Sequence, residues 1–390
     1  MKIDLGQKLY KKYIKKIPGG TQLLSKKPEI YLPNLWPSYF KKAKGCEIIS
    51  VGGKKYLDCT NNSVGMCTLG YANKFVDNRV SKVIKNGNIS TLNSIEELKI
   101  TDKLLKLHPW FESVRFSKSG GEAISIAIRI ARAYSKKEKV MFCGYHGWHD
   151  WYISANLYKK NLDSHLLPMI PASGVPKSLL NTSMPFEYNN FDDFKKKFLK
   201  NKNNLAAVIM EPTRNFMPKK GYLQKIRNLC KKNKVVFIFD EITSGWRECL
   251  GGIHKKFKVY PDIAVFSKAI SNGYPLSCII GKYDIMKHSM GSFISSANWT
   301  ERIGFAAGLA TIDYMKKYDS QKKIILTGKK IKKKWHEISQ KNSVQIQITG
   351  LDALPTFSFK DFNNDIALTF FSQEMLKKSI LASSQFFPTI

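Results

Sequence analysis

Residues 235–268 read VVFIFDEITSGWRECLGGIHKKFKVYPDIAVFSK, and this stretch decides the fold. It holds two apolar runs, Val235–Phe239 and Ile263–Phe266, each short enough to form a single strand. Strands this apolar are buried on both faces, which is typical of a parallel sheet covered by helices on two sides. We therefore expect Asp240 and Lys268 to lie at strand ends, where open α/β sheets bind their ligands.

Further apolar runs and amphipathic segments alternate outward from this stretch. The other strands predicted for the sheet are Val114–Ser117, Val140–Cys143, Ala207–Met210 and Cys278–Ile280. Helices are predicted over 121–134 and 222–232, where apolar residues recur at helical spacing. Near the N-terminus, residues 46–50 and 55–58 are predicted to form a hairpin joined by Val51, Gly52 and Gly53.

These elements predict an α/β fold with a mostly parallel central sheet. The large domain is predicted to span residues 65–290. A smaller α+β domain is predicted from both chain ends, residues 1–64 and 291–390.

Composition narrows the class of protein. The chain has 390 residues, of which 43% are hydrophobic, and this is enough for a large core. No apolar run reaches the roughly 18 to 20 residues of a membrane span, and no apolar region follows the basic N-terminus. We therefore expect a cytoplasmic protein without a membrane partner. The seven cysteines form no CxxC pair, which predicts reduced thiols and gives no support for a metal site.

The net charge of +34 raises the possibility of nucleic-acid binding. However, 56 of the 64 basic residues are lysines spread along the whole chain, whereas specific readout depends largely on arginine. We expect solvated faces and no specific nucleic-acid partner. The densest group, Lys329, Lys330, Lys332, Lys333 and Lys334, is predicted on the wet side of a late helix with Ile331 and Trp335 inward.

A Ser-Gly-Gly turn links the strand ending at Ser117 to the helix predicted after it. Ser119, Gly120 and Gly121 would begin that helix, and the N–H groups of its first turn form an anion site that suits a phosphate. An ordinary serine N-cap fits the same residues. Neither a GxGxxG nor a Walker loop is present here.

Two further loops follow predicted strands. Tyr145 and His146 lie in a GYHGWHD loop after residue 143, where an aromatic side chain between glycines can lie flat on a planar ligand. Packing of the loop alone is an equally good interpretation. Asp240 suits a protonated nitrogen partner, although a helix N-cap would also use an acid. Lys268 after a buried strand is costly unless it is paired or covalently bound, and desolvation lowers its pKa as a Schiff-base lysine requires.

Together these features fit one ligand. A planar pyridinium needs a carboxylate at its ring nitrogen, an aromatic face, a phosphate cradle and a lysine at its aldehyde. The predicted cofactor is therefore pyridoxal 5′-phosphate.

Five stretches carry a resemblance to one family: FSKSGGEAISIAIRIARAY, CGYHGWHDWY, VIMEP, FIFDEITSGWRECLGG and YPDIAVFSKAISNGYPLSCIIG. On these, the chain from Pro18 onward resembles the class III, fold type I aminotransferases, and within them the glutamate-1-semialdehyde aminomutase-like group. By this resemblance Lys268 is the lysine that joins the cofactor, Asp240 the partner of the ring nitrogen and Tyr145 the stacked aromatic. Glu211, in a Glu-Pro motif, would line the cofactor side of the pocket. The other implied cofactor contacts are Ser119, Gly120, Gly121, His146 and Thr300.

The chain departs from the family pattern at three places. Gly121 stands where the family usually carries a hydroxyl or similar small residue. Ala297 stands where relatives have a threonine that reaches the partner subunit's phosphate, and Ser296 or Thr300 could substitute for it. The chain also stops at Ile390, where relatives continue through a final helix, so a truncated copy is one expectation.

The resemblance implies ping-pong amino transfer between a small-molecule amino donor and a carbonyl acceptor, in a homodimer with each site near the interface. The alternative is an intramolecular glutamate-1-semialdehyde 2,1-aminomutase that uses the same residues. A nucleic-acid-binding protein and a non-catalytic relative on the same fold also stay open. Arg247 and His149 are candidates for recognising a substrate carboxylate or hydroxyl, and a structural role fits both equally.

Overall fold

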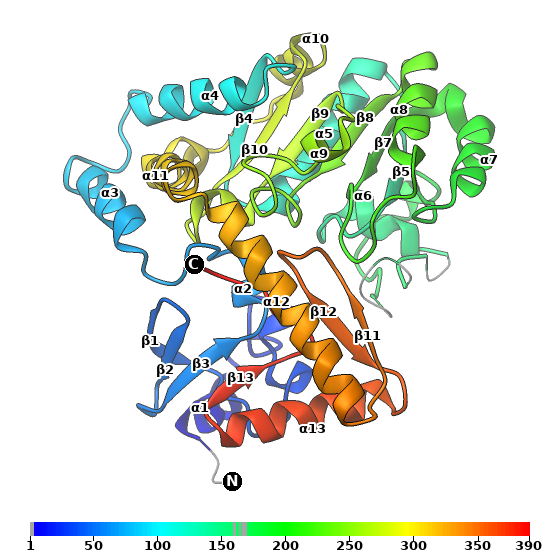
Figure 1. Cartoon of the computed structure of the whole chain (residues 1–390). Coiled ribbons are helices and arrows are strands. Elements are labelled where there is room, and N and C mark those ends of the chain that lie inside the picture. The colour runs from blue at the N-terminus through cyan, green and yellow to red at the C-terminus, as the bar shows by residue number, and fades with distance from the viewer. Residues whose placement is uncertain (1–3, 159–160, 164, 166–169) are drawn as a thin grey trace. The chain divides into compact units, whose positions relative to one another are not determined.

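A computed structural model describes residues 4–158, 161–163, 165 and 170–390 of the chain. It divides into two compact units, residues 79–313 and residues 1–78 with 314–390. The first unit holds a seven-stranded sheet, and the second holds a four-stranded and a two-stranded sheet (Figure 1). The domain boundaries expected after residues 64 and 290 stay predictions.

The seven-stranded sheet confirms the predicted α/β fold. Its order is β4 (Ser113–Ser117), β10 (Ser277–Gly281), β9 (Ile263–Phe266), β8 (Val236–Asp240), β7 (Leu205–Met210), β5 (Lys139–Cys143) and β6 (Ser183–Pro185). The strands from β9 to β6 are parallel, and β10 is antiparallel to both of its neighbours. Only β6 was not predicted, because a three-residue segment ending in proline carries no strand pattern.

Helices cover both faces of this sheet, which explains why its central strands are so apolar. On one face, Ile238 and Val265 belong to a core with α5 (Gly120–Ser135). On the other face, Phe237 and Phe239 belong to a core with α7 (Phe191–Asn201) and α8 (Tyr222–Lys232). Successive residues of a strand point to opposite faces, so every residue of β8 is buried.

The second unit joins the two ends of the chain through one strand pair. Its larger sheet has the order β1 (Phe40–Lys44), β2 (Glu47–Ser50), β3 (Lys55–Cys59) and β13 (Ile380–Ala382). The hairpin of β2 and β3 was predicted, and β13 adds parallel to β3. A separate pair is formed by β11 (Ile346–Thr349) and β12 (Thr356–Phe359). The predicted smaller α+β part from both chain ends is thereby confirmed.

The other α-helices of the described residues are α1 (Leu5–Tyr13), α2 (Asn62–Gly65), α3 (Lys74–Lys85), α4 (Ile95–Leu107), α6 (Asp150–Ile153), α9 (His254–Phe257), α10 (Tyr283–Met286), α11 (Arg302–Tyr318), α12 (Ser320–Lys341) and α13 (Asn364–Lys377). None of the helices in the described part of the chain is both long and apolar enough to cross a membrane.

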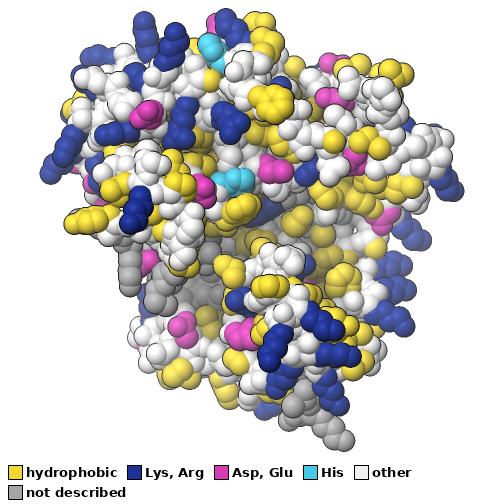
Figure 2. All heavy atoms as spheres, turned by 180° about the vertical axis from the view of Figure 1, so that it is seen from behind, with side chains coloured by type: hydrophobic (Ala, Val, Ile, Leu, Met, Phe, Trp, Pro, Cys, Tyr) yellow, Lys and Arg dark blue, Asp and Glu magenta, His cyan; other side chains and the backbone are white. Residues whose placement is uncertain are grey.

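The lysine-rich segment forms part of α12, as predicted. Its lysines are exposed except Lys332, whose Nζ donates to the Gly350 carbonyl at 2.6 Å and pairs with Asp352 at 3.1 Å. The prediction that this whole group is solvated was therefore wrong for Lys332, because its amine binds these two acceptors instead of water alone. Lysine and arginine side chains are scattered among apolar ones over the face in Figure 2, as expected for solvated charges.

Candidate active site

The site begins with two buried side chains at the carboxyl ends of β8 and β5. Asp240 is the last residue of β8 and is 2% exposed, and His146 follows β5 and is 1% exposed. His146 Nδ1 lies 2.7 Å from Asp240 Oδ2, while Asp240 Oδ1 accepts the Ile242 N–H at 3.0 Å. His146 thus contacts the carboxylate and orients it, which fixes the imidazole as the donor at Nδ1.

Lys268 follows the neighbouring strand β9, whose Val265 lies opposite Asp240 in the ladder. Its backbone φ is +50°, in the left-handed region that residues other than glycine rarely adopt. Backbone strain of this kind is common at functional sites, where the surrounding structure holds a side chain in a fixed position. Burial, together with the charges of Arg214 and Arg247, lowers the pKa of Lys268 to about 7, while Glu211 and Asp240 oppose this shift. A large share of this amine is therefore neutral at physiological pH.

A chain of polar contacts runs from Lys268 to the end of β7. Lys268 Nζ donates to Thr243 Oγ1 at 3.0 Å, and Arg214 Nη2 donates to the same oxygen at 3.0 Å. Arg214 Nη2 also pairs with Glu211 Oε1 at 2.7 Å. Burial raises the pKa of the Glu211 carboxyl, and the Arg214 charge opposes that rise.

The Tyr145 loop is attached to the same carboxylate. Glu211 Oε2 accepts the Tyr145 N–H at 3.1 Å, and Tyr145 packs edge-on against Tyr152 with ring centroids 6.1 Å apart. Gly144 has a φ of +117°, and a Cβ there would lie 2.5 Å from Glu211 Oε2. A glycine is therefore required for the loop to approach Glu211 this closely.

The Ser-Gly-Gly turn begins α5 as predicted. Ser119 is the N-cap, and its hydroxyl and the Glu122 carboxylate form a capping box. A Cβ on Gly147 would lie 3.2 Å from the Gly121 Cα, so the Tyr145 loop lies directly against this turn. The structure thus brings the predicted phosphate turn next to the predicted aromatic loop.

A second buried carboxylate stands beside the first. Glu241 is 0% exposed and accepts hydrogen bonds from Ser244 Oγ and from the backbone N–H groups of Ile253 and His254. Its Oε1 also lies 2.7 Å from His254 Nδ1. These bonds connect the start of the loop after Asp240 to Ser244 and to residues 253–254 near its end. Glu241 therefore stabilises the segment that carries Thr243.

The two residues suggested for substrate recognition occupy different positions. Arg247 is 2% exposed, and its Nε donates to the Thr243 carbonyl at 2.6 Å. Burial lowers its pKa to about 10. His149 stacks on Trp148 with ring centroids 4.5 Å apart. Arg247 therefore supports the backbone at Thr243, while His149 lies against the turn at Gly121.

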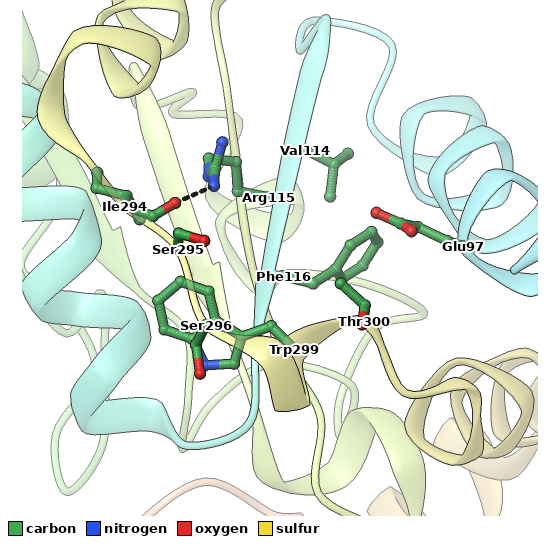
Figure 3. Close-up of a pocket in the computed structure, with 9 residues that line it drawn as sticks. All are labelled: Glu97, Val114, Arg115, Phe116, Ile294, Ser295, Ser296, Trp299 and Thr300. Atoms are coloured by element: carbon green, nitrogen blue, oxygen red, sulfur yellow. Dashed lines mark hydrogen bonds between the residues drawn. The ribbon is translucent and has the colours of Figure 1, made fainter. Parts of the chain in front are cut away.

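Thr300 lies in a different pocket from the one lined by Glu211. It is exposed, and its hydroxyl donates to the Ala297 carbonyl at 2.8 Å. Together with Ser296, Arg115 and Trp299 it lines a pocket of about 200 Å³ (Figure 3). Glu211 and Arg214 instead line a pocket of about 340 Å³ between the ends of β5 and β7. A contact of Thr300 with the cofactor of a partner subunit stays a prediction.

The residues around Lys268 fit pyridoxal phosphate. An amine whose pKa is about 7 suits attachment to an aldehyde. A buried carboxylate held by His146 suits a protonated ring nitrogen. The N-terminus of α5 suits the phosphate, because its first N–H groups and dipole attract anions.

Sequence reasoning missed Arg214 and Thr243. Arg214 follows Glu211-Pro212 at the end of β7, and Thr243 follows Asp240-Glu241 at the end of β8. Position after a buried strand was the signal that identified Asp240 and Lys268, and it could have identified these residues as well.

Comparison with known proteins agrees with this geometry. A model of the family "Aminotransferase class-III" matches residues 33–379. The chain is 30% identical to the 3-aminobutyryl-CoA aminotransferase of Cloacimonas acidaminovorans, covering 92% of this chain and 84% of that protein. It is 31% identical to a glutamate-1-semialdehyde 2,1-aminomutase of Lachnoclostridium phytofermentans, covering 91% and 84%. The solved FumI protein of Sphingopyxis sp. MTA144 shares the fold with a TM-score of 0.88 at 19% identity, covering 98% of this chain and 91% of that one. The chain belongs to the class-III aminotransferase family.

Proposed function

We propose that this pyridoxal-phosphate-dependent enzyme moves an amino group from a small-molecule donor to a small carbonyl compound in two half-reactions at one site. The observation that carries the proposal is that Asp240 ends β8 while Lys268 follows the adjacent strand β9. The family membership supplies the cofactor and the reaction class. The identity of the donor and acceptor is left to experiment.

Each side chain has a separate task in this proposal. Lys268 would hold the cofactor through its amine, and Asp240 would keep the ring nitrogen protonated. Ser119, Gly120 and Gly121 would hold the phosphate at the start of α5. Tyr145 would cover one face of the ring. When bound, pyridoxal phosphate supplies an electron sink for the carbon that bears the substrate's amino group.

Lys268 would also move the proton. In the enzyme–substrate complex its neutral amine would take a proton from the substrate carbon next to the nitrogen and later give that proton up again. A pKa of about 7 suits both steps, because the group is near the midpoint of its titration at neutral pH. Thr243 accepts from the amine and so limits the positions that it can occupy.

An intramolecular aminomutase is the second candidate. Its support is that similar relatives carry that name, at about the same identity as the aminotransferase relative. Both reactions need the same residues, and they differ in whether a keto product leaves. Incubation with an amino donor alone separates them. Release of a keto acid with a stable pyridoxamine enzyme supports transfer, whereas turnover of glutamate-1-semialdehyde without a second substrate contradicts it.

We also propose a homodimer. Large apolar side chains are exposed on residues 84–98, at Ile84, Ile89, Leu92, Ile95 and Leu98. Phe293 is 91% exposed and Met290 is 75% exposed in the same unit. Exposed apolar residues in this number mark surfaces that another protein covers. Sedimentation that gives the mass of one chain would contradict this proposal. The cytoplasmic location stays a prediction from the sequence.

A further inference from the structure

Four charged side chains surround the Lys268 amine. Arg214 and Arg247 are cationic and oppose its protonation, while Glu211 and Asp240 favour it. Asp240 is already held by His146 Nδ1 and the Ile242 N–H. Arg247 is fixed to the Thr243 carbonyl. The remaining pair, Glu211 and Arg214, therefore decides how strongly a negative charge acts on the amine.

Glu211 needs a cationic partner because it is only 6% exposed. A buried carboxylate without such a partner is costly, so it takes up a proton or finds another cation. If Arg214 were absent, the Lys268 ammonium would be the cation next in line along the polar chain through Thr243. Such an ion pair would stabilise the protonated amine, which is neither a nucleophile nor a base.

Resting on the proposed function, we propose that Arg214 is a positioning residue that holds Glu211 and so keeps this carboxylate from forming an ion pair with Lys268. The geometry provides both parts of this role. Arg214 Nη2 contacts Glu211 Oε1 at 2.7 Å and Thr243 Oγ1 at 3.0 Å. The one guanidinium thus binds the carboxylate and is itself fixed by the hydroxyl that Lys268 also uses.

Thr243 provides the link between the two cations. A hydroxyl oxygen has two acceptor lone pairs, and here it accepts from Lys268 Nζ and from Arg214 Nη2. This arrangement keeps Arg214 close enough for its charge to act on the amine. Removal of Arg214 would take away a positive charge and expose a negative one, and both changes favour the ammonium.

The test measures how fast the apoenzyme joins added pyridoxal phosphate at different pH values. The rate of appearance of the visible absorbance follows the fraction of neutral Lys268, so its pH midpoint reports the pKa of that amine. We expect a midpoint near 7 in the unchanged enzyme. In Arg214→Gln the midpoint should rise by about one unit or more, which slows the reaction roughly fivefold or more at pH 7 and little at pH 9.

Companion variants make the result specific. Glu211→Gln should move the midpoint downward, and the double variant Glu211→Gln/Arg214→Gln should return it close to its original position. Arg214→Lys, which keeps a cation, should shift it less than Arg214→Gln. Arg227→Gln removes an arginine that is paired with Asp262 at 2.8 Å, and it serves as the matched control without an effect on the midpoint.

Two readouts separate this proposal from the function on which it rests. Borohydride trapping followed by peptide mapping should place the cofactor on Lys268. Trapping at another residue, or none, overturns the proposed function. A trapped Lys268 with an unshifted midpoint in Arg214→Gln overturns only the role of Arg214. If Arg214→Gln does not fold, a Glu211→Gln midpoint that fails to fall overturns it equally.

Discussion

Two neighbouring carboxylates at the end of β8 each contact a buried histidine, yet they are built for different tasks. Asp240 meets His146 Nδ1 at 2.7 Å, and Glu241 meets His254 Nδ1 at the same distance. Glu241 accepts three further hydrogen bonds, all from its own loop. The hydrogen bonds to Asp240 are the one from His146 and one from the Ile242 N–H, among the residues that the structure describes.

The difference shows how a site residue is distinguished from a structural one with the same chemistry. Burial and a histidine partner are common to both carboxylates, so neither feature identifies the functional one. A saturated set of local donors marks Glu241 as the residue that fixes the loop. Asp240 accepts fewer hydrogen bonds and so keeps acceptor capacity, as a partner for a ring nitrogen requires.

The largest effect should come from Lys268, which belongs to the site of Asp240 and not to the loop that Glu241 holds. Lys268→Ala removes the amine that would bind the cofactor and carry the proton, so we expect kcat to fall by about a thousandfold or more. The visible absorbance of the lysine-bound cofactor should be lost as well. Lys220→Ala, at an exposed lysine, is the control. An unchanged spectrum in Lys268→Ala would remove this residue from its role.

Isosteric amides at the two carboxylates test the comparison directly. Asp240→Asn should lower kcat about a hundredfold, because an amide cannot hold a protonated ring nitrogen as an anion does. Its cost in stability should be small, since His146 can change tautomer to accept from the new NH₂ group. The measurement is kcat together with the free energy of unfolding of each variant.

Glu241→Gln should have the opposite pattern, with a large loss of stability and a small change in kcat. Its amide would point an NH₂ group at hydrogen-bond donors that now meet a carboxylate, which costs about 2 kcal/mol or more of the free energy of unfolding. The kcat of the folded fraction should stay within a few-fold of the original value. Equal losses of kcat in both variants would show that the two acids do not have separate tasks.

The positions of Asp240 and Lys268 at strand ends could be predicted from the sequence, but the side chains beside them could not. An acid or a lysine directly after a buried strand contradicts the apolar pattern, so both could be located from the residues beside them. The contact of His146 with Asp240 could not be predicted, because β7 lies between their strands and the order of strands is not encoded locally. The contact between Thr243 and Arg214 could not be predicted for the same reason, because these residues follow different strands. Lys332 shows the opposite error, since helical spacing does not reveal an acceptor distant in sequence.

The pH dependence of activity should reflect the unusual environment of Lys268. Its pKa is lowered to about 7 by burial and by Arg214 and Arg247. In the proposed mechanism the active form is the neutral amine, which is free only in the enzyme–substrate complex, so activity at saturating substrate should rise with pH up to about 7 and fall roughly tenfold for each unit below it. A profile that stays flat down to pH 5.5 would contradict this assignment. If activity began to fall at a higher pH in Arg214→Gln, the pH profile would be connected to the charges around the amine.

The smallest effects on kcat should come from His146 and His254, the partners of Asp240 and Glu241. These variants test the difference between the two carboxylates most directly. His146→Phe removes the Nδ1 donor to Asp240 and should lower kcat about tenfold, because a hydrogen bond to a charged group contributes roughly 1.5–3 kcal/mol. His254→Phe removes the corresponding donor to Glu241 and should reduce stability while leaving kcat of the folded protein nearly unchanged. Each variant is measured for kcat and for thermal unfolding. If His254→Phe lowered kcat as much as His146→Phe does, the loop that Glu241 closes would have to position the reacting groups as directly as Asp240 itself.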